Sequence, residues 1–335
     1  MKENPYQKQF PDLMSGKRIM YVHGFASSAQ SGTVKRLRDT LPQTEVIAYD
    51  LPVHPHEAIA LLHEKVEKDK PHLIIGTSMG GMYTEQLYGT DRIVVNPAFQ
   101  IADTMGEHGM TGKQTFLNPR QDGQQDFIVT KAMVKEYRAV QEQCFRGADT
   151  EEQSRVWGLF GMSDELVHTY PLFMEHYRQG IWFDGEHRMD DRVFLHSVVP
   201  VIRWIDDRQE GRERPVVYIT IDALRDERGQ QRSSAMKVLR RLIEDYQVFV
   251  VAPSADYDTD SVQSIQQWCK QVVGVPAYGH LVFTRRRDLL YGDYLVSADE
   301  ADRNGDFMGT RILLGSDSFK TWEEIMVYFD RLGGQ

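Results

Sequence analysis

The sequence is short of cysteine, of long apolar runs and of positive charge. Only two of its 335 residues are cysteines, Cys144 and Cys269, which favours a reducing compartment over a disulfide-held scaffold. It contains no run of about 18 apolar residues, so no membrane-spanning helix is predicted. Residues 1–18 also lack the apolar segment of a signal peptide. We therefore expect a cytoplasmic protein.

The charge balance restricts the partners. Asp and Glu outnumber Lys and Arg by 49 to 39, which gives a formal net charge of −10. An acidic surface repels nucleic-acid phosphates and anionic lipid headgroups, so we expect neither nucleic acid nor membrane as a partner. A length of 335 residues suggests two domains, at about 100–200 residues each. The sequence leaves open whether the protein forms a homo-oligomer.

Short apolar runs alternate with amphipathic stretches in the first part of the chain. Strands are predicted within residues 18–25, 45–52, 72–78, 91–97, 155–161 and 180–186. Helical patterns separate the early runs, and this alternation predicts a parallel sheet of the α/β class. The polar interval 98–154, helical in its later part, is predicted to be a cap inserted between two strands.

A charged run, DDRQEGRER at 206–214, is interpreted as a linker because it contains no apolar residue. A second α/β pattern starts after it, with strands beginning at PVVYITIDAL and QVFVVAPSA and an amphipathic helix at the end. The predicted domains are therefore residues 1–207 and 214–335.

The segment LIIGTSMGGMY places Ser78 between Gly76 and Gly80, in the pattern Gly-x-Ser-x-Gly. An apolar run leads in and a helical pattern leads out, which is the context of a nucleophilic serine on a sharp strand-to-helix turn. Glycines are needed there because side chains would clash at so tight a turn. We favour a nucleophile over a small residue in a structural turn.

A nucleophilic serine needs a base, and the base needs an orienting acid, which follow in the order Ser, Asp or Glu, His in this type of site. Asp164 and His187 follow Ser78 in that order, and each comes just after a predicted strand. Asp164 is also a candidate helix cap, and Asp184 and Glu186 are alternative acids. His187 competes with three other histidines, His168, His176 and His196, of which His196 lies in an apolar run.

The oxyanion hole of such a site takes one backbone N–H from the residue after the serine and one from the loop after the first strand. These residues are Met79 and Phe25, the latter in YVHGFASS. For His23, in the same loop, we favour a structural role. The apolar side chains of the insertion are interpreted as packing the cap onto the sheet, with walls of an acyl pocket as the alternative: Phe99, Met105, Met110 and Phe116.

Residues 18–205 resemble the small α/β-hydrolase esterases of the YqiA type. The resemblance rests on IMYVHGFASS, LIIGTSMGGMY, IVVNPAF, GLFGMSDELV and FDGEHRM. It implies an α/β-hydrolase fold with a helical cap and hydrolysis of carboxylic esters through an acyl-enzyme. Short acyl esters or thioesters are the implied small-molecule substrates, and neither a metal nor an organic cofactor is implied. The family usually has glycine or aspartate before the catalytic histidine, where this chain has Glu186.

Residues 214–335 resemble the haloacid-dehalogenase-like superfamily, in particular its 5′-nucleotidase-type members. The matching segments are VVYITIDAL, FVVAPSADYD, RRDLLYGDYLVSADEADRNGDF and FMGTRILLGSDSFKTWEEI. The family's Asp-x-Asp is replaced by Thr220-Ile221-Asp222, and a threonine hydroxyl neither forms an acyl phosphate nor matches a carboxylate as a Mg²⁺ ligand.

The family's acidic pair near the end is also replaced, by Ser297 and Ala298. We therefore predict a catalytically inactive second domain without a metal. The remaining role for Asp222, Ser254 and Arg287 is to bind a phosphorylated ligand. Arg287 stands in place of the family's lysine. The alternatives to a serine esterase are a phosphohydrolase with an accessory first half and a non-enzymatic fusion that binds ligands in both halves.

Overall fold

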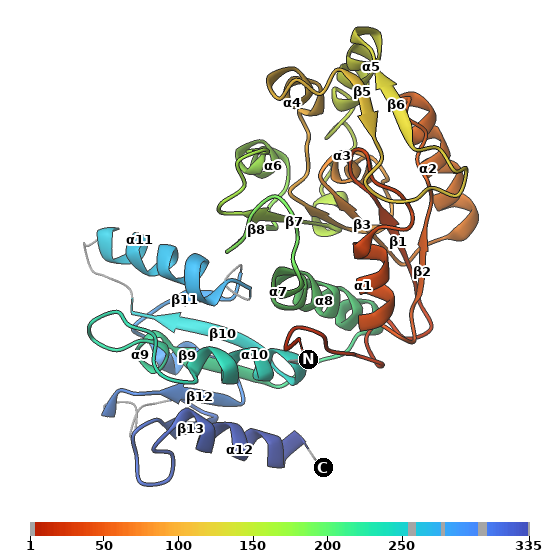
Figure 1. The fold of residues 1–335 in the computed structure, drawn as a ribbon. Coiled ribbons are helices and arrows are strands. Elements are labelled where there is room, and N and C mark those ends of the chain that lie inside the picture. Colours follow the sequence, from red (N-terminus) through yellow and green to blue (C-terminus); the bar gives the residue numbers. More distant parts are fainter. Residues whose placement is uncertain (1–3, 254–258, 276–278, 301–306, 334–335) are drawn as a thin grey trace. The chain divides into compact units, whose positions relative to one another are not determined.

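The computed structural model describes residues 4–253, 259–275, 279–300 and 307–333. Its internal contacts divide the chain into two compact units, Met1–Asp206 and Asp207–Gln335. Both units are α/β structures with a parallel sheet (Figure 1). Within the described residues, no helix combines the length and the apolar character needed to cross a membrane.

The first unit is built on six parallel strands in the order β2-β1-β3-β4-β7-β8. Their bounds are Arg18–Val22 for β1, Glu45–Ala48 for β2, Leu73–Thr77 for β3, Asp91–Val95 for β4, Val156–Gly161 for β7 and Gly180–Phe183 for β8. All five residues of β4 are buried, because strands inside a parallel sheet are covered on both faces. This is the α/β-hydrolase fold predicted from the sequence.

Helices connect these strands. They are α1 (Gly32–Thr40), α2 (Pro55–Asp69), α3 (Met79–Glu85), the 3₁₀ turn η1 (Glu152–Ser154), α6 (Tyr170–His176), α7 (Asp191–Val193), the π-helical segment η2 (Phe194–Val198) and α8 (Val199–Glu210). Ser31 caps the start of helix α1: its hydroxyl accepts the N–H of Val34 and so satisfies one of the unpaired amides of the first turn.

The insertion between β4 and β7 contains helices as well as a β-hairpin. Its elements are α4 (Ile101–Glu107), β5 (Gly112–Thr115), β6 (Asp126–Val129) and α5 (Lys131–Gln141), which lie together in Figure 1. The sequence predicts the later helix, and the antiparallel pair β5–β6 is an addition to the predicted helical cap. In β6, Phe127 and Val129 are buried while Ile128 is 63% exposed, so the hairpin has one face on the core.

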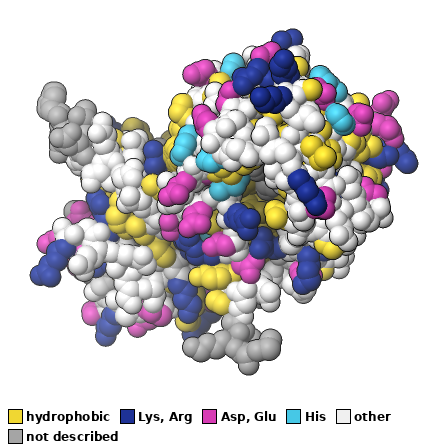
Figure 2. All heavy atoms as spheres, turned by 45° about the horizontal axis from the view of Figure 1, so that its top comes forward, with side chains coloured by type: hydrophobic (Ala, Val, Ile, Leu, Met, Phe, Trp, Pro, Cys, Tyr) yellow, Lys and Arg dark blue, Asp and Glu magenta, His cyan; other side chains and the backbone are white. Residues whose placement is uncertain are grey.

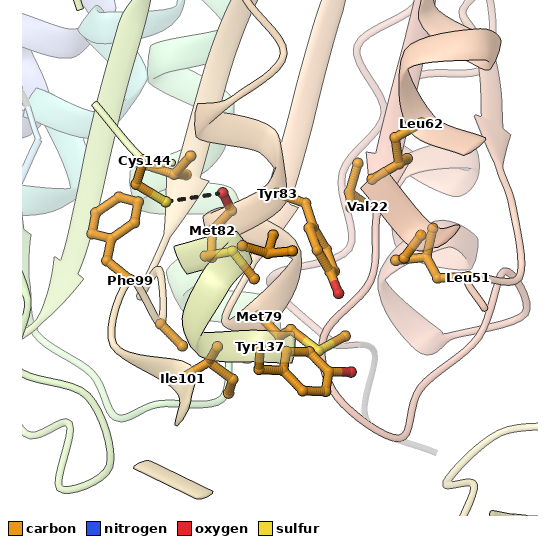
Figure 3. Packing of buried hydrophobic residues seen from close by; sticks show 14 of the residues in the cluster. Val22, Leu51, Leu62, Met79, Met82, Tyr83, Phe99, Ile101, Tyr137 and Cys144 are labelled. Atoms are coloured by element: carbon orange, nitrogen blue, oxygen red, sulfur yellow. Dashed lines mark hydrogen bonds between the residues drawn. The ribbon is translucent and has the colours of Figure 1, made fainter. Parts of the chain in front are cut away.

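The insertion shares one apolar core with the sheet. Met79 and Tyr83 of α3 meet Tyr137 of α5 in this cluster, and Figure 3 shows them together with Leu62 of α2. Of the four apolar side chains considered as pocket walls, two are fully buried in this core (Phe99 and Met105), and two are half-buried against it (Met110 and Phe116). The structure thus gives Phe99 and Met105 the packing role, whereas Met110 and Phe116 pack on the core and stay partly exposed.

The predicted linker is partly helical. Helix α8 continues through Glu210, and only the residues after it are irregular. Asp207 accepts hydrogen bonds from the guanidinium groups of Arg212 at 2.7 Å and Arg214 at 2.9 Å. A charged run without apolar residues is therefore compatible with an ordered helix end, because its ionic groups pair with one another.

The second unit has five parallel strands in the order β11-β10-β9-β12-β13. Its strands are β9 (Val216–Thr220), β10 (Gln247–Ala252), β11 (Leu281–Phe283), β12 (Tyr294–Ser297) and β13 (Thr310–Leu313). Its helices are α9 (Ile221–Leu224), α10 (Ala235–Asp245), α11 (Thr259–Trp268), η3 (Cys269–Val273), η4 (Arg287–Leu289) and α12 (Trp322–Gly333). The end of the predicted strand PVVYITIDAL is the short helix α9 instead.

Candidate active site

The predicted nucleophile occupies a strained turn between β3 and α3. Ser78 has φ 53° and ψ −123°, a conformation that side-chain-bearing residues rarely adopt. A Cβ atom on Gly80 would lie 2.1 Å from the carbonyl oxygen of Val22, and one on Gly76 would lie 2.4 Å from the carbonyl oxygen of Gly80. Both glycines of the motif are therefore required by backbone contacts that cannot move aside.

The neighbouring strand holds this turn in place. The N–H of Ser78 donates to the carbonyl oxygen of Val95 at 3.0 Å, and the Ser78 carbonyl oxygen accepts the N–H of Ala98 at 2.9 Å. These bonds tie the turn to the carboxyl end of β4 on both sides of the serine. The strain at Ser78 persists because the surrounding backbone fixes the residue independently of its own preference.

The structure brings Ser78, His187 and Asp164 together in one chain of hydrogen bonds. His187 Nε2 lies 2.9 Å from Ser78 Oγ, and His187 Nδ1 lies 2.8 Å from Asp164 Oδ2. The three residues come from the loops after β3, β8 and β7, at one edge of the sheet. Such an arrangement lets an imidazole take a hydroxyl proton while a carboxylate fixes its tautomer.

Asp164 is held by both of its oxygens. Its side chain is almost fully buried, and Oδ1 accepts the N–H groups of Leu166 at 2.8 Å and Val167 at 3.0 Å. Burial acts to raise the pKa of Asp164, but the hydrogen bond and charge of His187, together with the two N–H groups, outweigh it and lower the pKa. No helix begins at Asp164, because the next helix, α6, starts at Tyr170 with Thr169 as its cap. The helix-cap reading of Asp164 is therefore wrong: Oδ1 holds a turn of the loop, and Oδ2 contacts His187.

The alternative acids and histidines have other contacts. Asp184 pairs with Arg192 at 3.0 Å, and the carbonyl oxygen of Glu186 accepts a hydrogen bond from the side-chain amide of Asn96 at 3.0 Å. The remaining histidines lie elsewhere: His168 is exposed, His176 stacks on Phe145 and His196 meets the edge of Tyr6. Throughout the described part of the chain, only His187 places a ring nitrogen within hydrogen-bonding distance of Ser78 Oγ.

The two predicted oxyanion-hole residues flank the serine. Met79 is the first residue of α3, so its N–H has no carbonyl partner within that helix. Phe25 lies in the loop after β1, which passes so close to the elbow that a Cβ on Gly24 would lie 3.3 Å from Ser78 Cβ. Among the described residues, the Phe25 N–H donates no hydrogen bond within the protein.

The insertion holds the Phe25 loop in its conformation. The carbonyl oxygen of Ala26, a residue with φ 54°, accepts the N–H of Leu117 at 2.7 Å. Ser28 Oγ donates to the carbonyl oxygen of Pro119 at 2.7 Å, and the Phe25 ring meets the ring of Phe127 at 5.4 Å. The insertion is thus part of the scaffold of the site.

Asp50 is a supporting residue that sequence reasoning did not single out. Its Oδ1 accepts the N–H of Ala29 at 2.8 Å, and its Oδ2 accepts the N–H of Gln121 at 2.6 Å. One carboxylate thereby joins the loop after β1 to the insertion. The only sequence signal is an acidic residue directly after an apolar strand, which is too common to identify this function.

His23 has the structural position that the sequence favours for it. The buried ring donates from Nδ1 to the Gly24 carbonyl oxygen at 2.8 Å, and Nε2 accepts the N–H of Leu51 at 3.2 Å. This bonding requires the neutral imidazole. Burial lowers the pKa of His23 from 6.5 to about 4, against the opposing hydrogen bond to Gly24.

This shift predicts a loss of stability on acidification. Between pH 6.5 and pH 4 the unfolded chain binds a proton at His23 and the folded chain does not, so the free energy of unfolding falls as the pH falls. At about 1.4 kcal/mol per pH unit, we expect a loss of roughly 2 kcal/mol between pH 6.5 and pH 5.

The measurement is denaturant unfolding of the first unit at several pH values, for the wild type and for His23→Asn. All other titrating groups are common to the two proteins, so they cancel in the difference. The variant should show the shallower dependence on pH in this window. Equal slopes for the two proteins would contradict the assignment of a buried neutral histidine.

The second unit contains a charged cavity of about 720 Å³. Its lining includes four arginines, Arg225, Arg228, Arg232 and Arg287. Five acidic side chains also line it: Asp222, Asp226, Glu227, Asp299 and Glu300. Of the residues predicted to hold a ligand there, Asp222 and Arg287 line the cavity, and Ser254 lies outside the described residues.

The residues in place of the family's catalytic pair are already bonded. Thr220 is fully buried, and its hydroxyl donates to the carbonyl oxygen of Val296 at 3.3 Å. Asp222 Oδ2 accepts the N–H of Ala298 at 2.8 Å. No group of three or more His, Cys, Asp or Glu side chains suited to a metal occurs within the described residues. Thr220 offers a neutral hydroxyl, already bonded, at the position where the haloacid-dehalogenase-like sequences that this segment resembles have a carboxylate, and such a hydroxyl does not fit Mg²⁺ as a carboxylate does.

Comparison with known proteins gives a family and several weaker likenesses. A family model described as "Uncharacterised protein family (UPF0227)" matches residues 18–202, more than half of the chain. A protein of Vibrio phage KVP40, named "Putative 5'(3')-deoxyribonucleotidase", is 26% identical over 128 residues, which are 37% of this chain and 70% of the phage protein.

Two solved structures illustrate the likeness in fold. Est1E from Butyrivibrio proteoclasticus has 15% sequence identity and a TM-score of 0.42, over 61% of this chain and 93% of its own. A soluble variant of monoglyceride lipase from Saccharomyces cerevisiae has 14% identity and a TM-score of 0.40, over 58% of this chain and 87% of its own.

Proposed function

The chain belongs to the Uncharacterised protein family (UPF0227), and we propose that it is a serine hydrolase that cleaves carboxylic esters. The observation that carries the proposal is the hydrogen-bonded chain from Ser78 through His187 to Asp164, at a strained strand-to-helix turn. A serine with an imidazole on its hydroxyl and a buried carboxylate behind the imidazole is the arrangement that activates an alcohol as a nucleophile.

In the proposed mechanism, Ser78 Oγ attacks the ester carbonyl carbon while His187 Nε2 takes its proton. The carbonyl oxygen becomes an oxyanion, which the N–H groups of Met79 and Phe25 stabilise. Asp164 stabilises the imidazolium without accepting its proton. The proton then passes from His187 to the leaving alcohol or thiol, and the acyl group remains on Ser78. Water, activated by the same imidazole, attacks the acyl-enzyme, releases the acid and restores the serine.

The proposed substrates are small acyl esters or thioesters with short acyl chains, and the proposed location is the cytoplasm. Basic and acidic side chains are interspersed on the face that carries the insertion, as Figure 2 shows, which supports a small molecule over a polyanionic partner. Phe99 and Met105 are buried in the core and are therefore not available as walls of an acyl pocket. This supports a short acyl group over a long one.

The experiment is hydrolysis of p-nitrophenyl acetate, butyrate and octanoate and of a butyryl thioester, by wild type and by Ser78→Ala. We expect the highest kcat/KM for the short acyl chains and a background rate for the variant. Unchanged hydrolysis by a folded Ser78→Ala protein would show that the activity comes from another group, and the proposal would be withdrawn.

We propose a second role for the C-terminal unit, in binding a phosphorylated small molecule without cleaving it. The observation that favours it is the cavity whose lining includes four arginines, interspersed with five acidic side chains. Guanidinium groups match phosphate oxygens in charge and geometry. The similarity to the phage protein named as a deoxyribonucleotidase supports a haloacid-dehalogenase-like origin for this unit. The bonded hydroxyl of Thr220 supports the loss of turnover.

The test uses inorganic phosphate and deoxythymidine monophosphate in calorimetric titrations. We expect deoxythymidine monophosphate to bind and to remain intact, and we expect Arg228→Ala/Arg232→Ala to weaken the binding at least tenfold, at about 1.5–3 kcal/mol for each charged hydrogen bond. Asp222→Ala should leave ester hydrolysis unchanged. Phosphate release that disappears in Asp222→Ala would contradict the inactive assignment, and identical affinity in the arginine variant would contradict the site.

A further inference from the structure

Asn96 directly follows β4 and has an unusual backbone conformation. Its φ is 44°, in the left-handed region, which asparagine tolerates better than most residues with a side chain. The residue is 2% exposed, and its N–H donates to the carbonyl oxygen of Leu159 at 2.8 Å. A polar residue so deeply buried in a strained conformation needs a reason in the interactions of its side chain.

The side-chain amide of Asn96 makes three hydrogen bonds. Its Oδ1 accepts the N–H of Gly161 at 2.7 Å. Its Nδ2 donates to the carbonyl oxygens of Glu186 at 3.0 Å and His187 at 3.1 Å. An acceptor on one end and two donated bonds on the other require an amide, and neither a carboxylate nor a hydroxyl supplies this set.

These bonds join the two loops that carry the base and its acid. Gly161 ends β7 three residues before Asp164, and the Asp164 N–H donates back to the Gly161 carbonyl oxygen at 3.3 Å. The two loops also contact each other, because the N–H of Ser163 donates to the carbonyl oxygen of Gly185 at 3.0 Å. Asn96 is thus connected to the backbone of His187 itself and to the start of the Asp164 loop.

The strand end that carries Asn96 holds the nucleophile as well. The carbonyl oxygen of Val95, the residue before Asn96, accepts the N–H of Ser78 at 3.0 Å. Two consecutive residues at the end of β4 therefore fix the positions of all three members of the proposed triad: the Val95 backbone holds the serine, and the Asn96 amide holds the loops of the acid and the base.

We infer that Asn96 is a positioning residue, which sets the distance between His187 and its two partners through the Glu186–His187 backbone. The inference rests on the ester hydrolysis proposed above. Asn96 contacts no reacting atom, so its loss should leave substrate binding in place and slow the chemical steps. A displacement of a catalytic group by about 1 Å costs about 100-fold in rate.

The test compares Asn96→Gly and Asn96→Asp with the wild type. Glycine accepts φ 44° without strain but removes all three side-chain bonds. Aspartate has nearly the same shape and keeps the acceptor for Gly161, but it turns an oxygen towards two carbonyl oxygens. For both variants we expect kcat on p-nitrophenyl butyrate to fall about 10- to 1,000-fold, with KM changed less than twofold.

The rate of inactivation by a fluorophosphonate should fall by the same factor as kcat, because it depends on the same activated serine. The matched control is Asn4→Gly, which removes an asparagine that bonds Asp191 instead, and it should leave kcat unchanged. Circular dichroism and thermal unfolding establish that each variant is folded.

Each outcome decides the inference. Folded variants with a wild-type kcat would overturn it, and so would a loss confined to KM. If neither variant folds, Asn96 is required for the fold itself and the positioning role is wrong. A wild-type protein that neither hydrolyses esters nor reacts with the fluorophosphonate would instead remove the proposed function, independently of any Asn96 variant.

Discussion

His187→Ala is expected to lower kcat for ester hydrolysis by about 10⁴- to 10⁶-fold while leaving the fold intact, because members of a triad act as a unit. The imidazole is the group whose nitrogen lies 2.9 Å from Ser78 Oγ, so without it the hydroxyl keeps its proton. Its side chain is partly exposed at 21%, and truncation should therefore cost little stability. The measurement is steady-state hydrolysis of p-nitrophenyl butyrate with thermal unfolding in parallel.

Two further variants sharpen this prediction. Asp164→Asn removes the charge behind the imidazole and favours the wrong tautomer, which costs about 10⁴-fold in the serine-protease example. His168→Ala removes an exposed histidine that the site does not use, and it should retain the wild-type rate. A folded His187→Ala protein with more than about a tenth of the wild-type kcat would contradict the role given to this residue.

Among substitutions that add a single methyl group near the site, Gly80→Ala is expected to be the most destabilising. The new Cβ would lie 2.1 Å from the Val22 carbonyl oxygen and 2.6 Å from that of His23, and both are backbone atoms of the strand end and loop beside the elbow. Neither can move without disturbing the sheet or the loop after β1. We expect a loss of about 3–5 kcal/mol in the free energy of unfolding, at the upper end for overpacking.

The matched control is Gly106→Ala in helix α4. A Cβ there meets nothing within 4 Å, and alanine favours a helix over glycine by up to about 1 kcal/mol. This variant should be as stable as the wild type or slightly more so. Denaturant unfolding of both proteins provides the comparison, and a Gly80→Ala protein as stable as Gly106→Ala would contradict the described packing of the elbow.

The strands of both sheets are predictable because their signal is local. Runs such as LIIGT and VWGLFG are apolar over a strand length, and the structure contains them as β3 and β7. The strand-to-helix context of Ser78 is local too, and it reaches the structure unchanged. Strand β4 begins with two charged residues, Asp91 and Arg92, and is still predictable from the sequence because the next three residues are apolar. In the structure, the buried Arg92 pairs with Glu152.

The hairpin of the insertion is not predictable in the same way. The strand GKQT has no apolar residue and its pairing partner begins at Asp126, so neither periodicity nor a short turn marks the pair. What places it is the contact of Phe127 with the Phe25 ring, in a loop about a hundred residues earlier. The helical part of the predicted linker is hidden for a different reason: its charges pair within the segment, so a run without apolar residues is still ordered.

The supporting residues of the site are also hidden from sequence reasoning. Asp50 and Asn96 each follow an apolar strand, where polar residues usually serve turns. Their roles depend on loops that the fold brings in from residues 121, 161 and 187, and no local pattern encodes those neighbours. The identities of Ser78, Asp164 and His187 could be proposed from order and context, whereas their hydrogen bonds could not.

The most direct test of the central claim is reaction with a fluorophosphonate probe, followed by mass spectrometry of the modified peptide. Such probes react with activated serines and leave ordinary ones unmodified. The account predicts one modification, at Ser78 within LIIGTSMGGMY, which disappears in a folded His187→Ala protein. A folded wild-type protein that is not modified at Ser78, or whose modification persists without His187, would contradict it.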